Sequence, residues 1–270
     1  MKRTTTLLAA LAIVVAAAVA VPALTTTAGA ADTSQVSVVH GIPGVPVDVY
    51  VDDALTLTDF EPEAVAGPLE VPAGDHRVEI YAASPTPPDR APGSGALIDQ
   101  TETVPAGKSV SLVAHLDESG DPALTAFVDD TSALAAGQAR VTVRHTAAAP
   151  AVDVYVDGAK AVSDLSNPEE AVAEIPTGSH EIAVKVAGTD TTVIGPATLD
   201  FAANTNTIVY AIGSVRAENL GVVVQTVATS KPTPGDDEPS TTMPAAASTS
   251  PANPQAMPAV PTHAQPAYTG

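Results

Sequence analysis

One segment of the chain occurs twice at a constant spacing, and this repeat constrains the fold more than any other feature. Residues 36–60 read VSVVHGIPGVPVDVYVDDALTLTDF and align without a gap to residues 141–165, VTVRHTAAAPAVDVYVDGAKAVSDL. After a one-residue deletion the similarity continues, with 71–80 matching 175–184. Self-similarity at a fixed period indicates duplicated modules. We therefore expect two domains, each of roughly 90–95 residues, which is the size of an ordinary small domain.

The repeat divides the chain into five segments. We predict a signal peptide at 1–30, a first repeat at 35–130, a linker at 131–138, a second repeat at 139–229 and a tail at 230–270. The tail is rich in Pro, Ala, Thr and Ser and has no apolar periodicity. Such a composition buries too little apolar surface to offset the entropy of ordering the chain, so we expect the tail to be disordered.

The first thirty residues have the features of a secretory signal. Lys2 and Arg3 precede an apolar stretch from residue 7 to 21, and Ala28-Gly29-Ala30 has the small side chains that signal peptidase accepts. The stretch is shorter than the ~20 residues that span a bilayer, and no later stretch reaches that length. We expect cleavage near Ala30 and a secreted, extracellular mature chain without a membrane span, with association to the cell wall as an open alternative.

Within each repeat the apolar residues alternate with polar ones. Residues 47–51 and 152–156 both read VDVYV, which predicts a strand with valines on a buried face. Pro-x-Gly turns at 72–74 and 176–178 precede two further alternating segments. With later strands, the pattern predicts roughly seven per repeat and an all-β fold of two tandem antiparallel β-sandwich modules. Those later strands are expected near 96–104, 109–116, 123–129, 191–201, 206–213 and 220–228.

Composition excludes several classes of protein. The net charge of −20 argues against binding to nucleic acid or to an anionic membrane, because both require Lys and Arg. The absence of Cys excludes a disulfide framework, a thiolate metal site and a cysteine nucleophile. The acidity is uneven, since 36–130 carries seventeen acidic and three basic residues whereas 139–229 carries ten and five.

Four histidines recur in repeat-equivalent pairs on apolar strand faces: His40 with His145 and His76 with His180. The favoured interpretation is a partly buried imidazole that bonds a loop carbonyl or a carboxylate and fixes a turn. The alternative is a metal site in which both histidines of one repeat meet an aspartate.

The polar face of the VDVYV strand is the other candidate. We expect Asp48, Asp52, Asp153 and Asp157 to belong to a solvated acidic face, with calcium binding as the alternative and no other cofactor. The candidate ligand face consists of the outward residues Tyr50, Asp52, Tyr155 and Asp157. No GxSxG, SxxK or HExxH motif is present, so we predict no catalytic residues and no enzyme activity.

These motifs in combination resemble the domain-of-unknown-function 4397 family. The shared pattern is a VxVxH strand, the xVDVYVD strand and the Pro-x-Gly turn into an alternating strand, which recurs in both repeats with Asp53 replacing the expected turn glycine in the first. The resemblance implies a secreted protein with immunoglobulin-like or transthyretin-like sandwiches and brings no catalytic residues.

We therefore expect a non-catalytic, exported protein that acts as a structural, adhesion or interaction module of the cell envelope or extracellular space. Its partner would be an extracellular or cell-wall component. The alternative is a ligand-binding module for calcium, a glycan or a peptide, which would use the Tyr and Asp faces.

Overall fold

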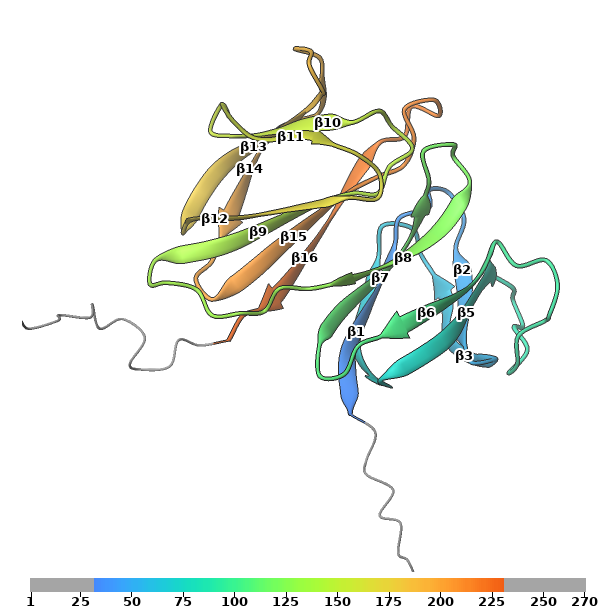
Figure 1. Cartoon of the computed structure of the whole chain (residues 1–270). Helices are drawn as coiled ribbons and strands as arrows, with labels where there is room; N and C mark the ends of the chain where they lie inside the picture. Colours follow the sequence, from blue (N-terminus) through green and yellow to red (C-terminus); the bar gives the residue numbers. More distant parts are fainter. Residues whose placement is uncertain (1–31, 231–270) are drawn as a thin grey trace, which may run out of the picture. The chain divides into compact units, whose positions relative to one another are not determined.

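The computed structural model describes residues 32–230, and these are all β (Figure 1). Sixteen strands and no helix occur in this range, and the strands form four four-stranded sheets, two in each repeat. This confirms two tandem β-sandwich modules. The predicted signal peptide and the tail from residue 231 onwards lie outside the described residues.

The first module pairs the sheet β4-β1-β7-β8 with the sheet β3-β2-β5-β6. The strands with one valine-rich face supply the core, whereas β3 and β4 at the sheet edges are more exposed. The strand bounds are β1 Thr33–His40, β2 Val47–Val51, β3 Ala54–Phe60, β4 Val65–Pro72, β5 Gly74–Ala82, β6 Ile98–Val104, β7 Ser109–Leu116 and β8 Pro122–Val128.

The second module repeats this topology strand by strand. Its sheets are β12-β9-β15-β16 and β11-β10-β13-β14. The strand bounds are β9 Gln138–His145, β10 Val152–Val156, β11 Ala159–Leu165, β12 Glu170–Pro176, β13 Gly178–Val186, β14 Thr192–Phe201, β15 Thr205–Ile212 and β16 Gly221–Ala228.

One pairing in each module differs from the antiparallel arrangement that the sequence predicts. β1 runs parallel to β7, and β9 runs parallel to β15, while every other pairing of named strands is antiparallel. Parallel neighbours require a crossover rather than a hairpin. The chain provides it by passing through the opposite sheet, because β5 and β6 lie there before β7 returns beside β1.

Each module has eight strands rather than the roughly seven expected, and the unexpected ones are β4 and β12. Both lie at a sheet edge, where they pair with β1 and β9. β4 contains Gly67 and Pro68, and β12 is built largely from Glu and Ala, which are all residue types depleted in strands. A proline is tolerated at such an edge because its missing N–H faces away from the ladder.

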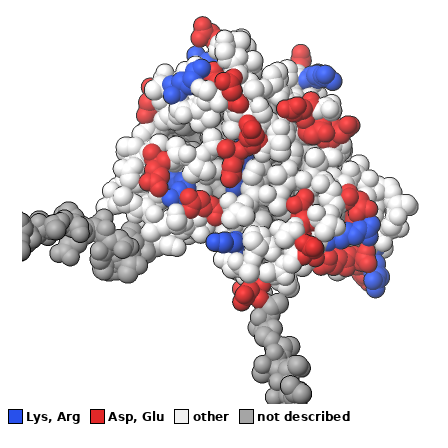
Figure 2. Space-filling view, viewed as in Figure 1, with Lys and Arg blue, Asp and Glu red and all other residues white. Residues whose placement is uncertain are grey.

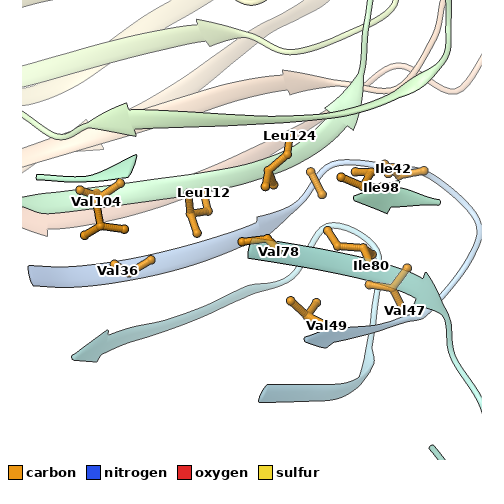
Figure 3. Packing of buried hydrophobic residues seen from close by; sticks show 12 residues of the cluster. Val36, Ile42, Val47, Val49, Val78, Ile80, Ile98, Val104, Leu112 and Leu124 are labelled. Atoms are coloured by element: carbon orange, nitrogen blue, oxygen red, sulfur yellow. The ribbon is translucent and has the colours of Figure 1, made fainter. Parts of the chain in front are cut away.

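A valine-rich core lies between the two sheets of each sandwich. Figure 3 shows the core of the first module, where Val36 and Leu112 from one sheet face Val49, Val78 and Val104 from the other. The second module has a corresponding cluster that includes Phe201. The alternating apolar pattern therefore supplies the core between the sheets, as expected.

A third cluster joins the two modules, which form one compact unit. Val39, Val113 and Phe127 of the first module pack with residues of β15 and β16 in the second, among them Ile208 and Tyr210. The segment 131–138 is packed as well, since Leu134 is buried and Arg140 donates to the Ser132 carbonyl oxygen over 3.0 Å. The outer face of one sheet in each module is therefore an internal surface of the protein.

Candidate functional site

His40 and His145 each hold the loop that follows their strand. The His40 Nε2 lies 2.8 Å from the Val45 carbonyl oxygen, and the Ile42 amide donates to Nδ1 over 3.4 Å. His145 makes the same two contacts, with Pro150 and Ala147. Both rings are buried, and this burial lowers the pKa of His40 and of His145. A neutral imidazole with both nitrogens in hydrogen bonds is a structural group of the loop.

His76 and His180 instead bond the aspartate of the β2–β3 or β10–β11 turn. The His76 Nδ1 lies 2.7 Å from Asp52 Oδ2, and its Nε2 lies 2.8 Å from the Pro72 carbonyl oxygen. The other Asp52 oxygen accepts the Arg77 amide over 3.0 Å. In the second module the equivalent bonds join His180 to Asp157 and Pro176, and Asp157 to the Glu181 amide.

These His–Asp pairs have a consistent electrostatic signature. The hydrogen bond to the Asp157 carboxylate raises the pKa of His180. Burial alone would lower the pKa of His76, but the hydrogen bonds to Asp52 and to the Pro72 carbonyl oxygen, together with the negative charges of Asp52 and Asp75, outweigh burial and raise the pKa. The same bonds lower the pKa of Asp52 and of Asp157. Each pair therefore favours an imidazolium–carboxylate contact, which anchors the hairpin turn to β5 or β13.

Asp48 and Asp153 are buried, so the expectation of a solvated acidic face is wrong for them. The two carboxylate oxygens of Asp48 accept the amides of Asp59 and Ser84 over 3.1 and 2.9 Å. Asp153 accepts the equivalent amides and also pairs with the Lys160 ammonium. These carboxylates replace backbone partners where the β2–β3 and β10–β11 ladders shift register.

The candidate ligand face differs between the two modules. The sequence places Tyr50 outward, but its side chain is only 1% exposed. The physical reason is the proline-rich loop 84–95, because the Tyr50 hydroxyl donates to the Pro88 carbonyl oxygen over 2.9 Å. Tyr155 has no such loop above it, is half-buried and contacts the Lys185 ammonium, 4.6 Å from its ring centroid.

The structure brings each Asp of this face to a histidine but forms no multi-ligand cluster. Within residues 32–230, no three His, Asp or Glu side chains are grouped so as to hold a metal ion. His40 and His76 each use both ring nitrogens in bonds to separate partners, so neither offers a lone pair to a shared ion. Calcium binding at the Asp positions stays a prediction.

A buried ionic network between the modules is absent from the sequence-based expectations. Arg144 donates to Asp129 over 3.0 Å, to Glu170 over 2.9 Å and to the Tyr210 hydroxyl over 2.8 Å, and it stacks on Phe127. Both charged groups of the Arg144–Asp129 pair are buried. Arg144 alternates with valines along its strand, which is the pattern of a solvent-exposed residue. Its burial can therefore be recognised only from the packing of the other module.

Acidic side chains outnumber basic ones on the face of the molecule that Figure 2 shows. No helix in residues 32–230 is long and apolar enough to cross a membrane.

Comparison with protein families gives one result. A family model for a domain of unknown function (DUF4397) matches the chain twice, over residues 34–155 and 146–238. A comparison with curated proteins found no match. The two matches cover well over half of the chain, and the described residues 32–230 consist of two copies of one sandwich topology. The chain therefore belongs to the DUF4397 family and carries two of its modules in tandem.

Proposed function

We propose that this chain is a non-catalytic, exported protein that acts as a structural, adhesion or interaction module in the cell envelope or extracellular space. The observation that carries the proposal is the identical use of equivalent polar groups in both modules. His40 and His145 hold a loop, while the Asp52–His76 and Asp157–His180 pairs hold a turn.

This use of the polar groups supports a framework role. A general acid or base must reach a substrate proton, and a nucleophile must be adjacent to such a base. Here the imidazoles and carboxylates that recur in both modules are bonded to the backbone or to one another within their own module. Duplicating a framework in this way reproduces a surface rather than a single reaction centre.

The packing between the modules supports the same proposal. The apolar cluster around Val39, Phe127 and Tyr210 and the buried Arg144–Asp129 pair join the two sandwiches. Two modules held by a packed interface present their outer surfaces to a partner in one arrangement. Such preorganisation lowers the entropy lost on binding.

Export rests on residues 1–30, so the first test is fractionation. A bacterium that makes the full chain with a C-terminal affinity tag should release it into the medium or retain it in the envelope, with an N-terminus at Ala31. Recovery of the protein in the cytoplasm with residues 1–30 intact would overturn export. A variant with Lys2 and Arg3 replaced by Glu is the matched control, because a signal peptide requires a positive start.

The second test concerns the interaction role. The exported protein is titrated onto isolated envelope fragments, and its depletion from the supernatant is measured. We expect saturable retention without chemical change to the fragments. Retention that does not saturate, or release of soluble envelope fragments by the protein, would contradict the proposal. A rise in Tm with millimolar calcium would instead favour the ligand-binding alternative.

A further inference from the structure

The first module contains a hollow between its two sheets. The cavity has a volume of about 460 Å³ and is lined by apolar side chains from both sheets. Val36 and Leu112 on one side and Val78 and Val104 on the other form its floor and are at most 6% exposed, whereas the lining residues Val51, Leu69 and Val71 are half-buried. Figure 3 shows the four floor residues around the interior of the sandwich. The volume lies within the range of small-molecule sites, which are mostly apolar with a few polar groups.

Three of the five polar side chains that line this hollow are acidic, and the other two are Thr56 and His76. Asp52, Glu70 and Glu102 line it, and no Lys or Arg does. The fourth charged or titratable group, His76, is held by the Asp52 carboxylate and the Pro72 carbonyl oxygen. A ligand entering here meets a negative rim and an apolar interior.

Glu102 is the unusual member of this set. It lies on β6 with the same strand parity as the buried Ile98 and Val104, so it shares the face that looks into the sandwich. Its carboxylate makes no hydrogen bond or ion pair with any residue from 32 to 230, and burial raises its pKa. The Glu102 carboxylate is half-buried, so its charge is less well hydrated than that of an exposed carboxylate, and a cationic partner would stabilise it.

The second module shows which residues the same framework carries at the equivalent positions. His76 pairs with Glu102 across β5 and β6, and Gly74 pairs with Val104. The equivalent pairings are His180 with Leu199 and Gly178 with Phe201. Leu199 and Phe201 pack into the core of the second module, where Phe201 is only 2% exposed. The fold thus accepts large apolar residues at both positions, and Glu102 and Val104 are not required by it.

We propose that the hollow of the first module binds a small amphipathic cation, with its aliphatic body between the sheets and its ammonium group at Glu102. The aliphatic part replaces the contacts that Leu199 and Phe201 supply in the second module. The ammonium gives Glu102 the partner it lacks, with Asp52 and Glu70 adding to the negative potential of the rim. A fatty acid of the same length would place its carboxylate against three acids, so charge decides between the two ligand classes. This proposal does not depend on export.

The test uses three eight-carbon probes that differ only in the head group: n-octylammonium, 1-octanol and octanoate. Binding to the full chain is measured by calorimetry and by NMR shifts of the valine and leucine methyl groups. We expect n-octylammonium to bind most tightly, with shifts confined to the first module, and octanoate least. Each methylene added between butyl- and octylammonium should tighten binding about fourfold, because each buried methylene contributes a fixed increment.

Two variants test separately the contacts of the aliphatic chain and those of the ammonium head group. Val104→Phe introduces the side chain that the second module carries and should abolish binding of all three probes. Glu102→Gln keeps the volume and should reduce the preference for octylammonium over octanol about tenfold, as expected for loss of a charged hydrogen bond. If Val104→Phe does not fold, Glu102→Leu serves the same purpose. Glu118→Gln, in an exposed turn of the same module, should leave binding unchanged.

The proposal would be overturned by octanoate binding as tightly as octylammonium, by no binding of octylammonium, or by equal affinity of the native protein and a folded Val104→Phe variant. Methyl shifts in the second module of the same size as those in the first would also contradict it.

Discussion

Replacing Asp129 with alanine should destabilise the protein far more than removal of an exposed carboxylate. Asp129 follows β8 and is buried, where it accepts the hydroxyls of Ser109 and Ser111 over 2.8 Å and the Arg144 guanidinium over 3.0 Å. Arg144 is itself only 1% exposed. Removing the carboxylate therefore leaves a buried guanidinium, the buried Ser111 hydroxyl and the half-buried Ser109 hydroxyl with fewer partners.

The magnitude follows from the contacts that remain. Breaking a buried ion pair by removing one partner costs about 3–5 kcal/mol. Arg144 keeps its contacts with Glu170 and with the Tyr210 hydroxyl, so the lower end of this range applies. A loss of about 3 kcal/mol lowers the Tm of a chain of this size by about 6–12 °C.

The assay is urea unfolding followed by circular dichroism, together with thermal unfolding of the same samples. The matched control is Asp99→Ala, which removes an equally short but exposed ion pair with Arg77 and should cost less than about 1 kcal/mol. The double variant Asp129→Ala with Arg144→Met should recover part of the loss, because it no longer buries an unpaired charge. Equal effects of Asp129→Ala and Asp99→Ala would refute the reasoning.

Three further outcomes are expected. The Asp157 carboxylate raises the pKa of His180 above its usual 6.5, so the stability that this pair contributes is fully present below pH 6.5 and is lost as pH rises through the folded-state pKa. NMR titration and urea unfolding of the native protein and of Asp157→Asn check this dependence. An unshifted pKa of His180 in the native protein would contradict it. Phe201→Ala should destabilise the protein by about 3–5 kcal/mol in thermal unfolding, and a loss below 1 kcal/mol would show that Phe201 does not fill the core. Gly67→Ala should lower the urea midpoint more than Gly120→Ala: both glycines have positive φ, but only at Gly67 would the added Cβ lie 2.7 Å from a backbone oxygen.

The sequence predicts the strands best where two signals coincide. The VDVYV segments and the segments that follow the Pro-x-Gly turns each alternate apolar with polar residues and recur in both repeats. Each of them forms a strand in the structure. β4 escapes prediction because Gly67 and Pro68 interrupt its pattern, and its place at the sheet edge is set by pairing with β1. Local propensity carries no information about such a distant partner.

The candidate site is less predictable for a related reason. Alternation indicates that Asp48 and Tyr50 point away from the valine core, but it does not indicate what covers that outer face. The cover comes from residues 84–95, more than thirty positions along the chain. Arg144 illustrates the same limit on a larger scale, since its partner Asp129 lies in the other module.

The parallel pairing of β1 with β7 determines how a chain of such modules grows. Gln35 at the start of β1 lies opposite Ser109, and Val128 at the end of β8 lies opposite Val110. The chain therefore enters and leaves the first module at the same end of the sheet, and β9 and β16 repeat this in the second. With two strand spacings between the first and last strands, the two ends are separated by about 10 Å, whereas a strand of eight residues extends about 26 Å. Successive duplications would thus extend the protein across the strands more than along them. They would leave the loops at the opposite end of every module available for contact with a partner.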